Sequence, residues 1–426
     1  MSSSTCVCMV SDCFLPSLGG VEVHIFQLSQ HLRRLGYKVI VVTHARGARR
    51  GIRYMSDGLK VFYLPFIPFL DNCTLPTLWS SLPLFHQVLS REGCDVVHGH
   101  QATSTLALEC MLHASVLGLR TVFTDHSCFS FADGASIHTN KLLKYFLAHV
   151  DSCISVSHTN RENLVLRANL APEKIYVIPN AIDGTCFVPD PEKRPLPPTV
   201  NVVAINRLTH RKGIDLLADV IPIVCRMRPD VQWTIGGDGP KRAVLEDMID
   251  AHSLHDRVFL LGMLPHDQVR EVLKTAHVFV NCSLTEAFCI AIVEAACAGC
   301  QVVATDVGGV HEVLPPDILH LAPASSAGLA GEVLRATDVC RQRNPHAVHA
   351  RAVKMYDWGR VARRTSQVYL AVMDAPDVAL KDRVGSVLGR GKVAGPIFAV
   401  MLVLTSLLCR LLGLLFPHRC SLSRAR

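Results

Sequence analysis

Several short motifs that would identify a reaction on their own are missing from this 426-residue chain. It has no GxxxxGK[ST] phosphate loop, no HExxH pair for a catalytic zinc ion and no Asp-x-Asp clamp for a metal-bound diphosphate. The run Gly237-Asp-Gly239 lacks the third glycine of a dinucleotide fingerprint, because Arg242 stands there. These absences disfavour P-loop nucleotide hydrolysis and nicotinamide chemistry.

The chain also has no net charge outside one short C-terminal region. The residues from Lys381 onward carry a net charge of +7, and the remainder of the chain is neutral, so a general nucleic-acid groove is not indicated. The first thirteen residues lack a basic segment followed by an apolar one, so no secretory signal is predicted. Seventeen irregularly spaced cysteines argue against a disulfide framework. We therefore expect the body of the protein in the cytosol.

One long apolar run stands inside the basic C-terminal region. Residues 393–416 contain a single formally charged residue, Arg410, and are long enough to cross a hydrocarbon core of about 30 Å. The sequence predicts one membrane helix here, and a hydrophobic helix docked on a partner protein is the alternative. Both interpretations place the chain at a membrane. The loop 46–53 and the helical stretch 76–90 are further candidates for membrane contact.

Short apolar runs alternate with amphipathic stretches through the body, which is typical of α/β folds with parallel sheets. The proline-rich run 189–198 can neither continue a helix nor fill a central strand, so it predicts a domain boundary. We expect two doubly wound, Rossmann-like domains that face a ligand cleft at the carboxyl ends of their strands. The predicted organisation is an N-terminal acceptor-side domain (1–188), a linker (189–198), a second domain with closing helices (199–375), a polar connector (376–392), the membrane helix (393–416) and a basic tail (417–426).

Individual elements can be placed as well. The first domain is expected to contain strands at 6–10, 38–43, 96–98, 121–124, 153–155 and 175–178, and helices at 21–35, 105–117 and 157–167, the last capped by Ser157. The second is expected to contain strands at 200–205, 232–236, 258–260, 277–280 and 301–304, and helices at 213–226, 241–252, 266–275 and 286–298.

The second domain carries residues suited to a diphosphate and a sugar. Arg207 and Lys212 follow a strand and precede a helix, where two cations could replace a metal ion on a diphosphate. Glu286 and Glu294 are eight positions apart on a predicted helix, a rise of about 12 Å that is too long for a glycosidase pair. That spacing suits the two ends of one extended ligand. Glu294 lies among apolar residues, so it is expected to accept hydrogen bonds from something polar.

Further candidates lie in the first domain. Gly19-Gly20 opens a helix after the first strand, where backbone N–H groups could approach a diphosphate, although a plain turn has the same pattern. His98, His100 and His126 stand at strand ends, and contact with a hydroxylated substrate fits them better than a metal site. We expect no metal and no cofactor.

Taken together, these residues resemble a known family. Pro16-Ser-Leu-Gly-Gly20, His98-Gly-His100, Thr124-Asp-His-Ser127, Ile178-Pro-Asn-Ala181, Arg207 with Lys212-Gly213, Gly236-Gly-Asp-Gly-Pro240 and the two spaced glutamates are similar to retaining glycosyltransferases of the two-Rossmann-domain type (GT-B, family 4). Phe131-Ala-Asp133, Thr139-Asn-Lys-Leu142 and the apolar C-terminal run resemble the branch of that family that acts on phosphatidylinositol. The resemblance covers roughly residues 6 to 375.

The resemblance implies roles for these residues. Arg207 and Lys212 would hold the donor diphosphate, Glu294 the ribose and Glu286 the sugar, with Gly237 also at the donor. Gly19 and Gly20 would let the first domain close on the phosphates, and His126 would contact the transferred sugar. His98, His100 and Asn180 are acceptor-side candidates. The departures are His210 in place of an aromatic and the cysteines at 297 and 300.

The same resemblance implies a substrate pair and a location. The donor would be UDP-GlcNAc, the acceptor phosphatidylinositol, and the partners other subunits of a GPI N-acetylglucosaminyltransferase complex at the endoplasmic reticulum membrane, with a cytosolic catalytic body and no nucleic acid. The sequence leaves open a lipid-directed mannosyltransferase that uses GDP-mannose. It also leaves open a catalytically silent, membrane-tethered subunit that binds a nucleotide sugar, and a nicotinamide oxidoreductase as a distant third.

Overall fold

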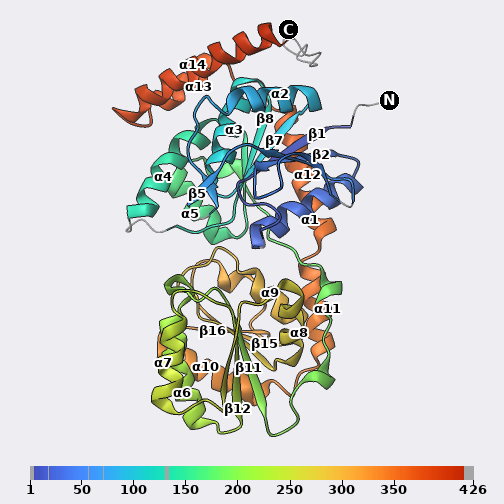
Figure 1. Ribbon diagram of the computed structural model, residues 1–426, viewed down its shortest axis with the longest axis vertical. Helices are drawn as coiled ribbons and strands as arrows, with labels where there is room; N and C mark the ends of the chain where they lie inside the picture. Colours follow the sequence, from blue (N-terminus) through green and yellow to red (C-terminus); the bar gives the residue numbers. More distant parts are fainter. Residues whose placement is uncertain (1–3, 18, 56, 71, 130–133, 417–426) are drawn as a thin grey trace. The chain divides into compact units, whose positions relative to one another are not determined.

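A computed structural model describes the chain except for residues 1–3, 18, 56, 71, 130–133 and 417–426. The chain forms two compact units, Met1–Pro179 with Trp358–Arg426 and Asn180–Asp357. Figure 1 shows a sheet with helices on its faces in each unit. The basic tail and the Phe131-Ala-Asp133 motif lie outside the described residues.

The division between the units differs from the expected one. The proline-rich run 189–198 lies inside the second unit, where it contains a short helix (Pro191–Lys193). Helix α12 (Trp358–Asp374), expected in the second domain, belongs to the first unit because its buried face packs against α1 (Gly20–Arg34). Prolines show where regular structure stops, and which unit a helix joins depends on where its apolar face is buried.

The first unit is built on an eight-stranded sheet with the order β10-β9-β8-β7-β1-β2-β4-β3, parallel except between β3 and β4. Its strands are β1 (Cys6–Val10), β2 (Lys38–His44), β3 (Gly51–Tyr54), β4 (Lys60–Leu64), β7 (Val96–His100), β8 (Arg120–Asp125), β9 (Ser152–Ser155) and β10 (Ile175–Val177). All five residues of β1 are buried, which explains its continuous apolar run. The six strands expected here are present, whereas β3 and β4 were not predicted.

Helices flank this sheet. They are α1, α2 (Leu82–Glu92), α3 (Thr105–Val116), α4 (Gly134–Phe146), α5 (His158–Ala168) and α12. The predicted cap of α5 is confirmed, because the Ser157 side chain accepts a hydrogen bond of 3.0 Å from the Asn160 amide. A two-stranded antiparallel ribbon, β5 (Pro68–Leu70) with β6 (Cys73–Thr74), lies between β4 and α2 in the chain and was also not predicted.

The second unit has a fully parallel sheet with the order β13-β12-β11-β14-β15-β16, which is the doubly wound order of nucleotide-binding folds. Its strands are β11 (Val200–Ile205), β12 (Val231–Gly236), β13 (Val258–Gly262), β14 (Val278–Asn281), β15 (Gln301–Thr305) and β16 (Leu319–Ala322). Its helices are α6 (Ile214–Met227), α7 (Arg242–His252), α8 (His266–Thr275), α9 (Ile290–Cys297), α10 (Ser326–Val339) and α11 (Pro345–Met355).

One predicted helix is shorter than expected. The stretch 286–298 was expected to be helical throughout, but α9 begins only at Ile290. Cys289 has a left-handed backbone conformation, with φ of +66°, which interrupts the helix before it reaches Glu286. The argument that placed Glu286 and Glu294 on one helix is therefore wrong, and Glu286 belongs to a loop.

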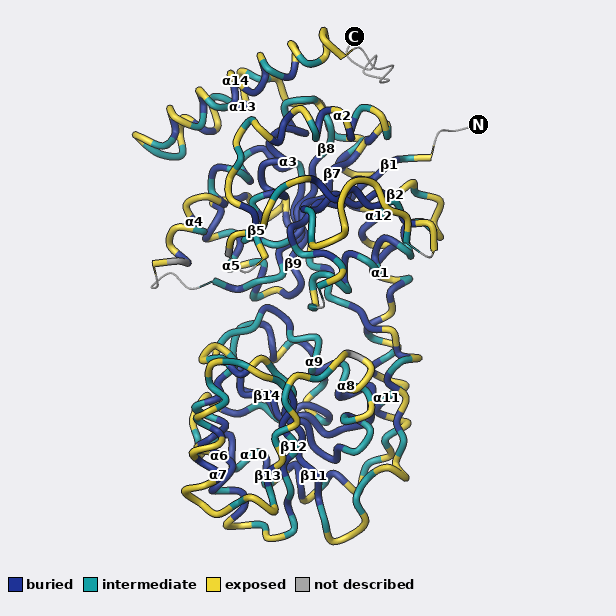
Figure 2. The backbone as a smooth tube through the Cα atoms, in the orientation of Figure 1, coloured by how far each residue is buried: buried dark blue, intermediate teal, exposed yellow. Residues whose placement is uncertain are grey.

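The C-terminal region forms two helices. The expected connector 376–392 contains α13 (Leu380–Leu388), and the expected membrane segment forms α14 (Ala394–Leu415). Within the described part of the chain, α14 is the helix long and apolar enough to cross a membrane. One side of α14 packs against α2 and α3, and Figure 2 shows exposed positions along the remainder of the helix.

Candidate active site

The second unit brings a cation and a carboxylate together at the carboxyl edge of its sheet. Lys212 ends a single helical turn after β11, and its ammonium group donates to a carboxylate oxygen of Glu286. Ser283 donates to the same oxygen at 2.8 Å. Burial lowers the pKa of Lys212, but neighbouring charges, first among them Glu286, outweigh this effect and raise the pKa above its ordinary value. Lys212 therefore remains a fixed positive charge.

Close backbone contacts hold this pair of loops in place. Gly213 has φ of +67°, and a Cβ atom there would stand 1.8 Å from the carbonyl oxygen of Cys282. Gly308 has a similar constraint, since its Cβ would stand 1.9 Å from the carbonyl oxygen of Glu286. Only glycine fits at either position. The loops that carry Lys212 and Glu286 are thus packed backbone against backbone.

Arg207 differs from Lys212. It is exposed, and its guanidinium group meets no acid among the residues that the structure describes. Its neighbour Asn206 has a buried side-chain nitrogen with no acceptor in the described chain. Gly237 has φ of +125° and packs against the Asn206 carbonyl group, where a Cβ would stand at 1.8 Å. Gly237 thus positions the Asn206–Arg207 backbone, and the donor contact expected of it stays a prediction.

Glu294 is a carboxylate in an apolar environment. It lies on α9 between the buried residues Val293 and Ala295, and no described group donates a hydrogen bond to it. Burial raises its pKa to about 7, so the ionised form is destabilised in the unliganded protein. A carboxylate of this kind is suited to accept hydrogen bonds from ligand hydroxyl groups.

The first unit contains a group of histidines at its own carboxyl edge. His98 and His100 on β7 are both fully buried. Both ring nitrogens of His98 already have hydrogen-bond partners within the protein. Nδ1 lies 2.6 Å from the Tyr369 hydroxyl, and Nε2 lies 2.7 Å from Thr124 Oγ1. Burial lowers the pKa of His98 to about 3. Neither side chain is exposed at the surface of the unliganded protein, and the acceptor contact expected of both residues stays a prediction.

His126 is the member of this group that reaches the surface. It follows β8, is only partly buried, and its Nε2 lies 3.3 Å from Nδ1 of His100. Burial and the neighbouring rings lower the pKa values of both residues, so both imidazoles are neutral at physiological pH. His100 thus acts on His126, whose tautomer and ring orientation it restricts.

A buried ion pair supports the loop that carries His126. Asp125, the last residue of β8, pairs with Arg167 of α5, and both side chains are fully buried. Arg167 also donates to the Ser127 carbonyl oxygen at 3.0 Å, and Asn160 donates to the same atom at 3.1 Å. These bonds fix the backbone on both sides of His126.

The remaining candidates have different positions. Gly20 is the first residue of α1 and Gly19 its N-cap, as expected, and a Cβ on Gly19 would stand 2.5 Å from a Glu22 carboxylate oxygen. Asn180, expected on the acceptor-side domain, is instead the first residue of the second unit. Its side-chain oxygen is buried and has no donor among the described residues.

Sequence reasoning missed four side chains that build these sites. Ser283 and Asn206 contribute to the second unit, and His24 and Arg167 contribute to the first. His24 lies on α1 with its ring 4.7 Å from that of His126. No short motif marks these residues, although Asn206 directly precedes Arg207 and could have been included with it.

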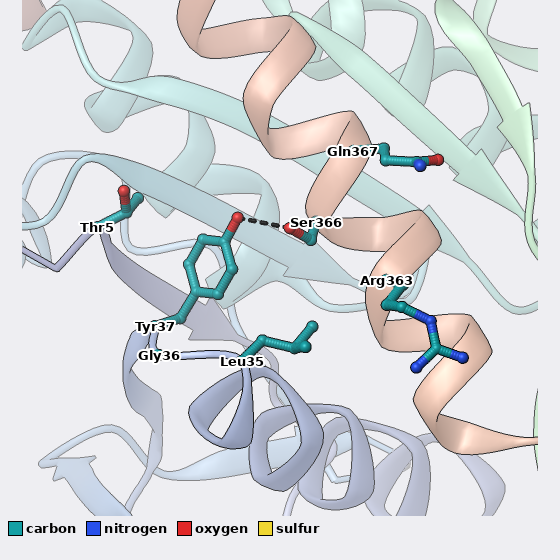
Figure 3. A pocket seen from close by; sticks show the side chains of 7 residues that line it. All are labelled: Thr5, Leu35, Gly36, Tyr37, Arg363, Ser366 and Gln367. Atoms are coloured by element: carbon teal, nitrogen blue, oxygen red, sulfur yellow. Dashed lines mark hydrogen bonds between the residues drawn. The ribbon is translucent and has the colours of Figure 1, made fainter.

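A pocket of about 400 Å³ in the first unit lies elsewhere. Its lining residues are Thr5, Leu35, Gly36, Tyr37, Arg363, Ser366 and Gln367. Figure 3 shows Tyr37 pointing to Ser366 of α12, with their hydroxyl oxygens 2.6 Å apart. Thr5 precedes β1 and Tyr37 precedes β2, so the pocket opens at the amino edge of the sheet, opposite His126.

Solved structures share this fold. Sucrose-phosphate synthase from Thermosynechococcus elongatus matches with a TM-score of 0.73 at 20% identity, covering 87% of this chain and 100% of that one. The Anabaena protein HepE, solved with UDP, matches with a TM-score of 0.67 at 17% identity, covering 86% and 100%. Residues 190–338 match the model for glycosyl transferases group 1. Together with the two doubly wound sheets, this defines a glycosyltransferase of the GT-B class, as predicted.

Curated relatives narrow the class. A protein of Arabidopsis thaliana that is named as one of the subunits of phosphatidylinositol N-acetylglucosaminyltransferase is 49% identical over 96% of this chain and 92% of its own length. The Homo sapiens protein of the same name is 47% identical over 93% and 82%. Residues 44–133 match the model named PIGA (GPI anchor biosynthesis). The chain belongs to the PIGA family of phosphatidylinositol N-acetylglucosaminyltransferase subunits.

Replacement of Gly213 by alanine tests the backbone contact beneath Lys212. We expect Gly213→Ala to lower the free energy of unfolding by about 2 to 4 kcal/mol, because the new Cβ meets a backbone carbonyl at a left-handed position. Gly331→Ala is the control, since its Cβ enters open space within helix α10. It should stabilise the protein by about 0.5 to 1 kcal/mol. Denaturant unfolding of the purified protein measures both, and equal effects would contradict this explanation.

Replacement of Glu294 by glutamine tests its desolvation. A carboxyl whose pKa is higher in the folded state holds its proton there, so stability falls as pH rises from about 4.5 to 7. We expect Glu294→Gln to stabilise the protein by about 3 kcal/mol at pH 8 and by less than about 1 kcal/mol at pH 5. Thermal unfolding at the two pH values measures this. A gain that is independent of pH would show that the charge is not the cause.

Proposed function

We propose that this protein transfers N-acetylglucosamine from UDP-GlcNAc to the inositol of phosphatidylinositol, the first step of GPI-anchor biosynthesis, with retention at the anomeric carbon. The main support is the 41 to 49% identity to relatives from plants, animals and yeasts that are named as part of this enzyme. The residues at the two carboxyl edges support it independently, because they suit a diphosphate, a ribose and a sugar.

The cations of the second unit hold the donor diphosphate. The Lys212 ammonium has three donors and uses one on Glu286, so it can bind a phosphate oxygen while its position is kept. Arg207 adds an uncommitted guanidinium fork at the same edge. Both stabilise the negative charge that develops on the leaving diphosphate, which is the largest electrostatic demand of the reaction.

The carboxylates bind the hydroxyl groups of the donor. Glu294 accepts hydrogen bonds from the ribose hydroxyls. These bonds take the place of the hydrogen bonds from water that the buried carboxylate does not have. Glu286, fixed by Lys212 and Ser283 through one oxygen, accepts from the sugar through the other. His126 contacts the transferred sugar, and His100 positions its ring. His98 and the Asp125–Arg167 pair are structural supports.

The reaction is proposed to proceed on one face of the sugar. The bond between the anomeric carbon and the diphosphate oxygen breaks, and an inositol hydroxyl oxygen forms the new bond on the same face. The hydroxyl proton passes to the departing diphosphate oxygen, so the products are the glycosylated lipid and UDP. Water is excluded while this occurs, because it would otherwise hydrolyse the donor.

The membrane helix brings the enzyme to its acceptor. We infer a location in the endoplasmic reticulum membrane, with α14 as the single span and the catalytic units in the cytosol, as part of a complex with other subunits. The relatives' names, which describe each of them as one subunit of the enzyme, support the complex. A membrane-bound enzyme meets phosphatidylinositol in two dimensions, which raises the effective concentration of the acceptor.

The other functions considered from sequence are less well supported. A mannosyltransferase that uses GDP-mannose would have the same kind of donor site, but the full-length relatives carry the N-acetylglucosaminyl name. A silent subunit that binds a nucleotide sugar would keep the same binding residues, so it differs from the proposed enzyme only in lacking transfer activity. Incubation of microsomes with labelled UDP-GlcNAc and GDP-mannose in parallel distinguishes all three, since only one donor should label phosphatidylinositol.

Replacement of the cations tests the donor site. We expect Lys212→Ala and Arg207→Ala to lower the transfer rate at least about a hundredfold each, because each removes charge stabilisation from the leaving diphosphate. Lys241→Ala is the matched control, since Lys241 pairs with Asp215 at 2.8 Å instead. Transfer to phosphatidylinositol in microsomes is the measurement. Wild-type rates in either variant would remove that residue from the proposed site.

Treatment with a chelator tests the expected absence of a metal requirement. One ring nitrogen of each of His24, His100 and His126 lies within 4.8 Å of the other two, so these residues could hold a metal ion. Because Arg207 and Lys212 already supply positive charge, we expect EDTA and dipicolinic acid to leave transfer unchanged. Loss of activity that zinc restores would instead make these histidines a metal centre.

A further inference from the structure

The first unit exposes several large apolar side chains within one short stretch. Residues 67–78, called the apolar segment below, include the β5–β6 ribbon. Ile67 is 86% exposed, Phe69 75%, Leu75 57% and Leu78 42%. Single exposed apolar residues are common on soluble proteins, but a group of this kind marks a contact surface.

This segment is held firmly at its base. The Thr74 amide donates to the buried Asp12 carboxylate at 3.0 Å. The amides of Thr77 and Leu78 donate to the buried Glu109 carboxylate at 2.6 and 2.8 Å. Hydrogen bonds to buried carboxylates fix the backbone, so the apolar side chains of the segment stay at the surface.

The base of the segment lies at the catalytic edge of the unit. Asp12 follows β1, and the adjacent Ser11 hydroxyl donates to the carbonyl oxygen of His100 at 3.4 Å. His100 in turn lies next to His126. The apolar segment therefore leaves the sheet beside the histidine that we propose as the sugar contact.

A basic loop leaves the same edge next to it. Residues 46–53, called the basic loop below, follow β2 and include the first three residues of β3. The amide of Ala45 donates to the carbonyl oxygen of Leu64 at 2.6 Å, shortly before the apolar segment. Arg49, Arg50 and Arg53 are exposed. Positive charge next to exposed apolar side chains is the combination that binds an anionic lipid surface.

The apolar segment is also linked to α14. The indole nitrogen of Trp79, one residue beyond the segment, donates to Thr405 Oγ1 on α14 at 3.0 Å. The outer side of α14 exposes further apolar residues, including Ile397, Leu407 and Leu411. Two exposed apolar surfaces thus belong to the same unit. Because Thr405 lies at the centre of α14, this hydrogen bond must break for α14 to span the bilayer.

We propose that the apolar segment and the basic loop bind the surface of an anionic phospholipid bilayer. The apolar side chains insert at the boundary between the headgroups and the acyl chains, the arginines contact lipid phosphates, and the edge that carries His126 is brought to the acceptor. This second contact is separate from the anchoring by α14. The inference rests on the proposed function only for the identity of the acceptor.

Tryptophan fluorescence tests the contact without measuring activity. Full-length Phe69→Trp protein is reconstituted into vesicles of phosphatidylcholine and phosphatidylinositol with brominated acyl chains. We expect its additional emission, relative to the parent protein, to be quenched, because bromine quenches only at contact. Phe259→Trp, 41% exposed on β13 in the second unit, is the matched control and should not be quenched.

Two results of this measurement would overturn the proposal. Unquenched, solvent-like emission would show that the segment lies in water. Emission shifted to shorter wavelength but unquenched in the assembled complex would show that a partner protein covers it. Either result leaves the proposed transfer reaction intact, so failure of the contact and failure of the function can be distinguished.

A kinetic measurement tests the consequence for the reaction. We expect Phe69→Asp, and separately Arg49→Gln with Arg50→Gln, to raise the KM for bilayer phosphatidylinositol about tenfold, with the Kd for UDP-GlcNAc unchanged. Met263→Asp, at a 79% exposed position of the second unit, is the control. An unchanged KM in both variants would contradict the proposal.

Discussion

The ion pair between Lys212 and Glu286 is the interaction on which the donor site depends. It joins the loop after β11 to the loop before α9, and both loops are packed so tightly that glycine is required at positions 213 and 308. A lysine side chain positioned in this way loses little conformational entropy when it binds a ligand. In the proposed reaction, this preorganised charge acts together with Arg207 in place of a metal ion on the diphosphate.

The carboxyl edges of the two units differ in their charge. The second unit carries charged groups. The pKa of Lys212 is raised, so Lys212 stays protonated, and the Glu294 carboxylate is poorly solvated because it is buried. The first unit presents neutral imidazoles, because burial lowers the pKa values of its histidines. A cationic edge suits a diphosphate, whereas neutral rings suit a sugar or an inositol hydroxyl. If Glu294 binds the ribose as proposed, the destabilisation expected from its burial is the cost of keeping a vacant hydrogen-bond acceptor for the ligand.

Access to a lipid acceptor places a further constraint on the first unit. The proposed acceptor, phosphatidylinositol, keeps its acyl chains in the bilayer, so the proposed reaction requires the edge that carries His126 to reach the headgroups. The buried carboxylates Asp12 and Glu109 use backbone hydrogen bonds to hold the apolar segment at that edge. Polar interactions with buried carboxylates thus hold the backbone beneath an exposed apolar surface.

The sequence by itself determined the two doubly wound domains, eleven of the sixteen described strands, the long apolar helix near the C-terminus and the family, because hydrophobic periodicity and motif order are local in the chain. Tertiary structure decided the rest. Contacts between distant residues placed α12 in the first unit and Asn180 in the second, and buried His98 and His100. The left-handed backbone of Cys289 excluded Glu286 from its predicted helix. Burial and backbone approach arise only when segments far apart in sequence meet, so no local pattern specifies them.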